Sequence, residues 1–151
     1  MSQENVEVVR GFFGAMERFF GSYSKNPRSL VAAEQSGDLW PEYEEALGYA
    51  DPEVEWQTVF LGATHRGRRE IARAWDDFLR WTEGYKIRLE ETEDLDADRV
   101  FAVLTVSSTS KDGGSFGSRH FDIVTVQHGL IVRLAEFTDR EQALEASGLS
   151  E

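Results

Sequence analysis

Residues 119–140, RHFDIVTVQHGLIVRLAEFTDR, decide how this chain folds. Two apolar runs flank residues 127–129 (QHG), which predicts a β-hairpin with a three-residue loop, because a final glycine suits a type I turn followed by a bulge. In that register His120 lies opposite Glu136. A two-residue loop would shift the pairing by one residue and place Glu136 on the other face from Asp122.

The three-residue loop also places five side chains on one face of the hairpin: His120, Asp122, Val124, Leu134 and Glu136. An imidazole beside two carboxylates can keep one acid protonated and another charged, which proton transfer next to a carbonyl requires. The same three groups could bind a divalent metal, although no HxH or HExxH spacing supports a metal site. The structural alternative is that the aspartate forms an ion pair and the histidine an ordinary hydrogen bond.

Three more segments of the chain are expected to form strands. Apolar and polar residues alternate in residues 54–59 and 85–90, as is typical of half-buried strands. The nearly continuous apolar run of residues 99–110 predicts a central strand. Turns are expected at residues 96–98 and 111–115, which are rich in Asp, Gly and Ser.

The first helix is predicted over residues 3–20, where apolar side chains recur at spacings of three and four. Ser2 is its expected N-cap, and Gly21 is its expected end. Residues 21–26 are then predicted to form a loop.

Two short helices are expected between this loop and the first strand. Asn26 should cap the first of them and Gly37 should close it. Asp38 should cap the second, which continues to Ala50. The pair Asp51–Pro52 then stops the helical run, because a residue before proline avoids helical geometry.

Residues 61–67 are expected to connect the first strand to a third long helix that ends at Gly84. One face of that helix carries Ile71, Trp75, Phe78 and Thr82. Because only strands follow it, the chain fits an α+β class better than a repeating βαβ pattern. Asp139 begins a capping box for a final short helix that ends before Gly148.

The composition of the 151 residues fits one domain, since 40% are hydrophobic and 12% are aromatic. Asp and Glu number 28 against 16 Lys and Arg, and this net charge of −12 argues against binding nucleic acid or a membrane surface. The absence of Cys excludes disulfides and thiolate chemistry. Without a leader or an apolar run of membrane length, we expect a cytoplasmic protein.

Two smaller features invite a functional interpretation. His65, Arg66, Arg68 and Arg69 form a basic spot at a helix start, where an anion could sit, although a solvated spot is the plainer interpretation. Tyr23, Trp40 and Tyr43 either cover a pocket mouth as a lid or pack within the helical layer.

The order of these elements resembles the nuclear transport factor 2-like superfamily, and within it the SnoaL-like polyketide cyclase and ketosteroid isomerase branch. The segments that carry the resemblance are ENVEVVRGFFGAM (4–16), ADPEVEW (50–56), HRGRREIARAW (65–75), HGLIV (128–132) and FTDREQALEASGL (137–149). The resemblance covers the single domain 1–151 except for about residues 21–37, which look like a lengthened connection between helices.

The resemblance implies an α+β, cystatin-like fold, in which three helices wrap a curved, mostly antiparallel sheet into a cone around an internal apolar pocket. A short C-terminal helix follows, and the outer face of the sheet is expected to form a homodimer. Ketosteroid isomerases use a base on the first strand, a tyrosine on the first helix and a second acid on the penultimate strand. The second acid corresponds to Asp122 and the base to Gln57 or Thr58, neither of which can take up a proton. The first helix offers no tyrosine at the matching place but Phe12, Phe13 and Met16.

We therefore expect a cofactor-independent isomerase, cyclase or hydratase that moves protons on a hydrophobic carbonyl or ring compound. Asp122 would be its acid or base, His120 the partner, and Glu136 the orienting group. The side chains expected to line the ligand pocket are Trp56, Thr58, Trp75, Phe78, Val124 and Leu134. The alternative, favoured by the missing base and tyrosine, is a non-catalytic pocket for an apolar ligand or a dimeric interaction module. No metal and no cofactor are expected in either case.

Overall fold

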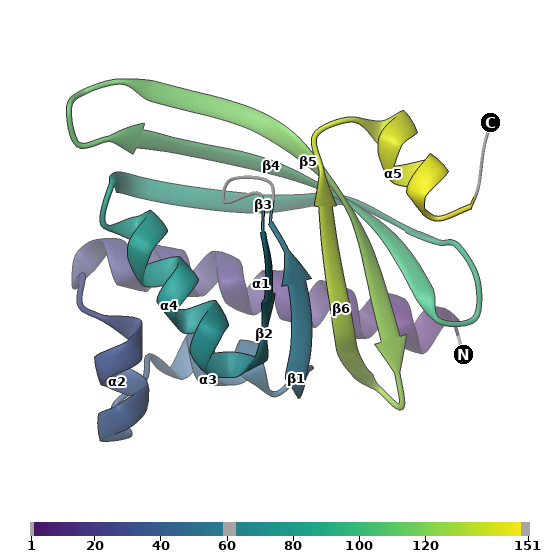
Figure 1. The fold of residues 1–151 in the computed structure, drawn as a ribbon, viewed down its shortest axis with the longest axis horizontal. Coiled ribbons are helices and arrows are strands. Elements are labelled where there is room, and N and C mark those ends of the chain that lie inside the picture. The colour runs from purple at the N-terminus through teal and green to yellow at the C-terminus, as the bar shows by residue number, and fades with distance from the viewer. Residues whose placement is uncertain (1, 59–62, 149–151) are drawn as a thin grey trace.

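The computed structural model describes residues 2–58 and 63–148, which form one six-stranded sheet with helices packed against it (Figure 1). The helices are α1 Ser2–Lys25, α2 Leu30–Ser36, α3 Pro41–Leu47, α4 Gly67–Leu79 and α5 Arg140–Ala146. The strands are β1 Ala50–Gln57, β2 Thr64–Arg66, β3 Thr82–Asp94, β4 Arg99–Ser110, β5 Ser115–Gln127 and β6 Leu130–Phe137. The predicted α+β class is confirmed.

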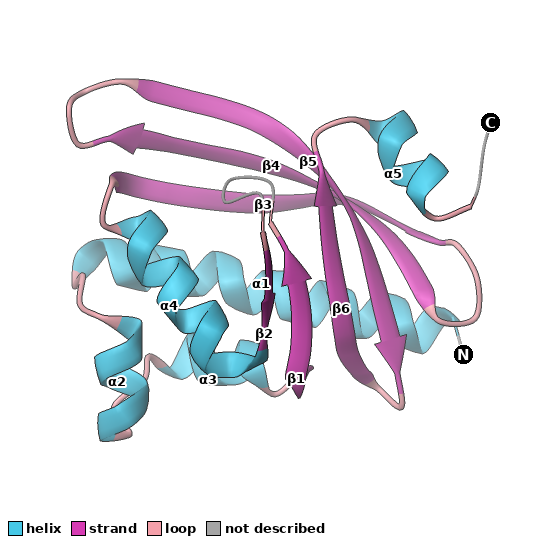
Figure 2. Cartoon of the chain, in the orientation of Figure 1, coloured by secondary structure: helices cyan, strands magenta, loops and turns pink. Residues whose placement is uncertain are grey.

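The sheet has the strand order β2-β1-β6-β5-β4-β3, and β1 and β6 form its one parallel pair among the described strands. Figure 2 shows the long strands β3, β4 and β5 curving across the molecule, and the last part of β5 bends to run beside β6. Helix α1 follows the sheet along its length, and α2, α3 and α4 gather at one end of it. This curvature creates a concave inner face that the helices cover.

Helix α1 is longer than the sequence predicts. It continues through Gly21 to Lys25, so the loop expected at residues 21–26 is wrong, and Ser2 lies within the helix rather than at an N-cap. A glycine inside a helix costs about 1 kcal/mol. Burying apolar and aromatic surface outweighs that cost, because Phe20 is nearly inaccessible and Tyr23 packs on the core beyond the glycine.

Helix α2 begins at Leu30 and not after the expected Asn26 cap. Ser29 is the N-cap, and the carboxylate of Asp76 on α4 accepts hydrogen bonds from the Leu30 and Val31 amides at 2.7 and 3.0 Å. The positive end of a helix favours such a carboxylate, so a distant residue sets the start of α2. Gly37 closes the helix as predicted, with a φ of 74°.

The next two predicted boundaries are also displaced. Helix α3 starts at Pro41 with Trp40 at its N-cap, whereas the exposed Asp38 lies near Arg28, with 3.7 Å between their charged atoms. Helix α3 stops before Ala50, which already belongs to β1. The predicted first strand, 54–59, therefore starts four residues late, and its last residue lies outside the described residues.

Residues 61–67 were expected to be a plain connection, but Thr64–Arg66 form the edge strand β2. It pairs antiparallel with β1, for instance His65 with Trp56. Residues 61 and 62 lie outside the described residues. Gly84 does not end a helix: it lies within β3, with a φ of 61°, beside a register shift between Glu83 and Lys86. A glycine is suited to such a bulge because it tolerates a positive φ.

The β5–β6 hairpin has a two-residue turn, so the predicted three-residue loop is wrong. Gln127 pairs with Leu130, and His128 and Gly129 both have positive φ values of 54° and 80°, as a type I′ turn requires. A bulge at Val132 follows, because Val126 pairs with Ile131 and Thr125 pairs with Arg133.

This bulge decides where the acidic side chains lie. A two-residue turn alone would have placed Glu136 on the opposite face from Asp122. The extra residue in β6 shifts the register by one more position and returns both side chains to one face. Asp122 therefore pairs with Glu136, whereas the sequence predicted that His120 would.

The outer face of the sheet has an apolar cluster of its own, formed by Phe101, Val103, Phe121, Ile123 and Ala143. Helix α5 supplies Ala143 and covers this cluster, with the predicted Asp139 cap accepting hydrogen bonds from two backbone amides. The homodimer expected through the outer face stays a prediction, and α5 already covers part of that face.

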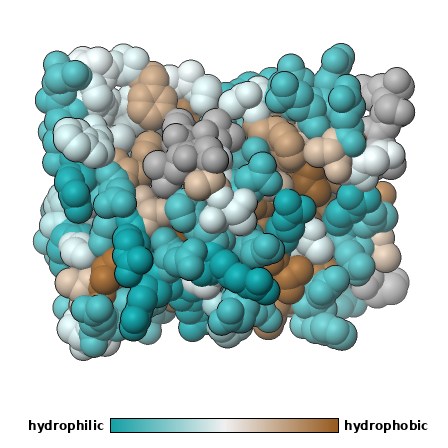
Figure 3. Space-filling model, in the orientation of Figure 1, coloured by the Kyte–Doolittle hydropathy of each residue, from teal (hydrophilic) through white to brown (hydrophobic). Residues whose placement is uncertain are grey.

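The side of the molecule seen in Figure 3 is mostly hydrophilic, and apolar residues reach its surface in small separate patches. Within residues 2–58 and 63–148, no helix is long and apolar enough to cross a membrane.

Candidate functional site

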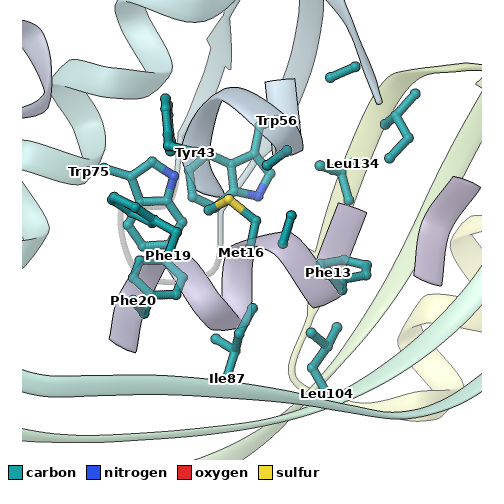
Figure 4. Close-up of a cluster of buried hydrophobic side chains, with 14 of the residues drawn as sticks. Phe13, Met16, Phe19, Phe20, Tyr43, Trp56, Trp75, Ile87, Leu104 and Leu134 are labelled. Atoms are coloured by element: carbon teal, nitrogen blue, oxygen red, sulfur yellow. The ribbon is translucent and has the colours of Figure 1, made fainter. Parts of the chain in front are cut away.

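An internal cavity lies between the concave face of the sheet and helices α1, α3 and α4. Most of the side chains that line it are apolar or aromatic. The helices contribute Phe13, Met16, Phe20, Tyr43 and Trp75, and the sheet contributes Trp56, Ile87, Leu104 and Leu134 (Figure 4). Such a lining favours a hydrophobic ligand. It offers few hydrogen bonds, so a polar ligand would lose its hydrogen bonds to water without gaining others in the cavity.

Stacked rings form one wall of this cavity. Trp56 on β1 and Trp75 on α4 lie 4.7 Å apart with nearly parallel planes. Phe20 packs against Trp75, with 4.9 Å between ring centroids. Because flat rings stack well on other flat rings, this wall suits a planar ligand.

Two carboxyl groups face each other across the β5–β6 pair and also line the cavity. Asp122 and Glu136 are directly paired in the sheet. Asp122 is only 1% exposed, and its Oδ1 has no hydrogen-bond partner among the described residues. Burial, and then the nearby charge of Glu136, raise the pKa of Asp122 well above its usual value. Both effects favour the neutral form of the Asp122 carboxyl group.

A tryptophan holds the second carboxylate in place. The Trp56 Nε1–H donates a hydrogen bond to Glu136 Oε2 at 3.0 Å. Because β1 runs parallel to β6 and pairs Trp56 with Leu134, the indole lies beside the Glu136 carboxylate. The two acids thus have different surroundings, one fully buried and one hydrogen-bonded and partly exposed.

Tyr85 is a site residue that the sequence reasoning missed. It lies on β3, lines the cavity and packs edge-on against Phe20 at 4.8 Å. Burial, followed by the charges of Glu136 and Asp122, raises its pKa well above the usual value, so its hydroxyl keeps its proton. A signal was present in the alternating pattern, since Tyr85 shares the inward-facing side of its strand with Ile87, but the resemblance implies a tyrosine on the first helix.

His120 lies two residues from Asp122 on the same strand, is 3% exposed and lines the cavity. Burial lowers the pKa of its imidazole. The neutral ring is thus favoured near neutral pH, so His120 could take up a proton but would not supply a positive charge.

The other predicted pocket residues divide into three groups. Trp56, Trp75 and Leu134 line the cavity. Thr58 and Phe78 line a smaller cavity next to it, which shares Trp56, Trp75, Tyr85 and Glu136 with the larger one. Val124 lines neither cavity, because at this point of β5 the side chain is fully packed in the core.

The position expected to hold a base on the first strand contains none. Gln57 accepts a hydrogen bond from Arg133 Nη2 at 3.3 Å, on an exposed part of the molecule. Thr58 is the residue on the cavity side. Of the three residues considered as a lid, Tyr23 and Trp40 pack around Phe19 in the helical layer, and Tyr43 lines the cavity.

A metal site does not form at the hairpin. Within the described residues, no three His, Asp or Glu side chains come together in an arrangement that could hold a metal ion. Asp122, His120 and Glu136 share a cavity wall without converging on one point that a cation could occupy.

Comparison with known proteins identifies the family to which the chain belongs. A family model described as the SnoaL-like domain matches residues 28–134. A proposed polyketide cyclase from Xanthomonas campestris pv. campestris is 15% identical, with a TM-score of 0.63 over 93% of this chain and 94% of that one. TerC, co-crystallized with polyporic acid, is 19% identical, with a TM-score of 0.63 over 94% and 98% of the two chains.

A protein with a ketosteroid isomerase-like fold from Catenulispora acidiphila, in complex with trimethylamine, is 15% identical, with a TM-score of 0.56 over 80% of this chain and 90% of that one. At these identities the likeness concerns the fold. No curated protein sequence matches the chain significantly. Because the family model covers well over half of the residues, the chain belongs to the SnoaL-like family, and its fold matches that of a nuclear transport factor 2-like protein from Burkholderia pseudomallei, with a TM-score of 0.63.

Proposed function

We propose that this protein is a cofactor-independent enzyme that moves a proton on a hydrophobic carbonyl or ring compound, as an isomerase, cyclase or hydratase. One observation carries the proposal: Asp122 and Glu136 are paired across two strands on the wall of an apolar cavity. Two carboxyl groups with different surroundings are what acid and base roles in one site require.

The chemistry assigns a role to each group. The protonated Asp122 donates a hydrogen bond to the substrate carbonyl oxygen, and the Tyr85 hydroxyl is placed in the same cavity as a second donor. The Glu136 carboxylate, oriented by Trp56, takes a proton from the carbon next to the carbonyl. The resulting enolate is stabilised by the two donors, and Glu136 returns the proton to carbon.

His120 is assigned a supporting role. Its neutral imidazole lies beside Asp122 on β5 and adds a polar group to an otherwise apolar wall. The solved structures of this fold support a small-molecule pocket, since one of them was co-crystallized with polyporic acid and another is a proposed polyketide cyclase.

The test is α-proton exchange on a ring ketone, which reports proton transfer without knowledge of the natural substrate. The protein is incubated with 2-tetralone in D2O, and deuterium uptake is followed by NMR. We expect exchange above the buffer rate, and losses of about a hundredfold in Asp122→Asn and Glu136→Gln. Asp98→Asn is the matched control, because it makes the same chemical change at an exposed residue outside the cavity.

A second candidate is a non-catalytic pocket for an apolar ligand. It is favoured by the first strand, where Gln57 and Thr58 replace the base of ketosteroid isomerases. In that case 2-tetralone would raise the melting temperature of the protein, while deuterium uptake would stay at the buffer rate in the wild type and in both variants.

A further inference from the structure

We propose that the molecule bound in this cavity carries an anionic group, and that Arg68 on α4 pairs with it. The inference takes the cavity of the proposed function as a binding site, but it does not require catalysis there. It defines the ligand class as a flat apolar compound with one acidic group, such as a carboxylate, at the end away from Asp122.

Arg68 is the only Lys or Arg among the described residues that line the cavity. It lies in the first turn of α4 and is partly buried. Its Nη2 donates to the Leu47 carbonyl at 3.4 Å, which is a long hydrogen bond. Its Nε is buried and has no hydrogen-bond partner in the described part of the chain. A buried charged donor without a partner is unfavourable, and a bound anion would supply that partner.

Several other arginines, though not all of them, have an acidic partner among the described residues, in a chain where acids outnumber bases by 28 to 16. Those with a carboxylate within 4 Å are Arg10, Arg18, Arg28, Arg80, Arg99, Arg119 and Arg140. No such ion pair is found for Arg68 within residues 2–58 and 63–148. Its charge is therefore available to a ligand in the cavity that it lines.

A second group acts at the same place. Tyr43 on α3 lines the cavity and is 2% exposed. Burial, followed by Glu34 and Asp76, raises the pKa of Tyr43, whereas the charge of Arg68 opposes this rise. The guanidinium thus lies close enough to influence the phenol, and a carboxylate next to Arg68 would have the phenol O–H nearby as a further donor.

The charges also determine the orientation of the ligand. Leu47, Arg68 and Ile71 are partly exposed and line the cavity from α3 and α4, whereas Asp122 is buried on the sheet side. An anionic group would be repelled from the sheet side, where Glu136 is close enough to raise the pKa of Asp122. The anion therefore belongs at Arg68, and the opposite end of the ligand meets the Asp122–Glu136 pair.

The test compares two probes of nearly equal shape and different charge, trans-cinnamic acid and trans-cinnamamide. Binding to the full chain is measured by isothermal titration calorimetry at neutral pH, where the acid is ionised. We expect the wild type to bind cinnamate about tenfold more tightly than cinnamamide. In Arg68→Gln that preference should disappear, and in Arg68→Lys part of it should remain, because the positive charge is kept.

Arg69→Gln is the matched control. It removes the same charge from the next residue, which is exposed and does not line the cavity, so the preference for cinnamate should persist. Thermal melts of all variants establish that they fold. If Arg68→Gln is unstable, the reduced preference for cinnamate expected in Arg68→Lys still tests the inference. A loss of preference confined to the Arg68 variants supports the inference.

Three outcomes overturn it: equal binding of the two probes by the wild type, an undiminished preference in Arg68→Gln, and binding of neither probe. The result is distinguishable from that of the deuterium-exchange test. If the preference for cinnamate depends on Arg68 but no deuterium exchange occurs, the anionic ligand is supported and the catalytic role is rejected. If exchange depends on Asp122 but the preference is absent, the catalytic role is supported and the anionic ligand is rejected.

Discussion

Replacing Asp122 with asparagine should change how the stability of the protein depends on pH. Asp122 is 1% exposed, and its pKa is raised well above the usual value, first by burial and then by Glu136. In the unfolded chain the same carboxyl group has a pKa of about 3.9. Above that pH the unfolded state has lost a proton that the folded state still holds.

This difference in bound protons sets the direction in which stability changes with pH. Because the folded state binds more protons, the free energy of unfolding falls as pH rises from the unfolded pKa toward the raised folded pKa. One proton corresponds to a slope of about 1.4 kcal/mol per pH unit, and the wild type loses stability at about this rate in the window between the unfolded and the folded pKa of Asp122. Asp122→Asn stays neutral at every pH and lacks this loss. Relative to the wild type, the variant should therefore become more stable as pH rises through that window.

The assay is urea denaturation, followed by tryptophan fluorescence, at a series of pH values from about 4 upward, because the carboxyl group of the unfolded chain is ionised above this pH. Asp98→Asn is the control, since it removes an exposed carboxylate and should show no such divergence. A constant difference between the Asp122→Asn variant and the wild type over the whole range would refute the reasoning. It would mean that the carboxyl titrates alike in the folded and unfolded states.

Three further substitutions have expected outcomes that equilibrium unfolding can check. Trp56→Phe removes the hydrogen bond to Glu136 and should cost about 1–2 kcal/mol, and it should also slow deuterium exchange on 2-tetralone; exchange at the wild-type rate would contradict the orienting role of the indole. Gly21→Ala should stabilise the protein by up to about 1 kcal/mol, because the residue is helical with no atom near the added methyl group, and a loss of stability would argue against a continuous α1. Asp76→Ala leaves the first amides of α2 without their acceptor and should cost about 2 kcal/mol, whereas the same change at the exposed Asp77 on the same helix should cost much less.

The predicted central strand shows where the local sequence pattern is sufficient to predict the structure. Residues 99–110 were expected to form one strand, and β4 has the same bounds. A strand buried on both faces needs apolar side chains throughout, so its pattern is local and unambiguous. The Asp139 cap and the Gly37 stop are equally local, because each depends on residues within one helical turn.

The helix boundaries near residues 21–40 show where local pattern fails. Gly21 is a good stop signal in isolation, but aromatic packing beyond it continues the helix. Asn26 and Asp38 are good caps in isolation, but the Asp76 carboxylate from α4 and the proline at residue 41 set the observed starts. These competing interactions come from residues distant in sequence or from burial, and neither is visible in a short window.

The candidate site combines both cases. The alternating pattern of residues 119–140 determined by itself that His120, Asp122 and Glu136 belong to one hairpin, and the resemblance indicated an apolar pocket beneath it. Only the tertiary structure decided that Asp122 meets Glu136, because a type I′ turn and a bulge at Val132 together set the register. A bulge depends on how two strands pair within a curved sheet, and no short segment encodes that curvature.

The tertiary structure also decided which further side chains join the candidate site. Tyr85 is one of several alternating residues on its strand, and Arg68 stood out only as part of a basic helix start where an anion could sit. Their roles arise because the curved sheet and the helices bring β3, β5, β6 and α4 around one cavity. The sequence specifies which ionisable side chains are available. The surroundings of these side chains, and therefore the protonation state of each acid, depend on burial, which only the folded chain creates.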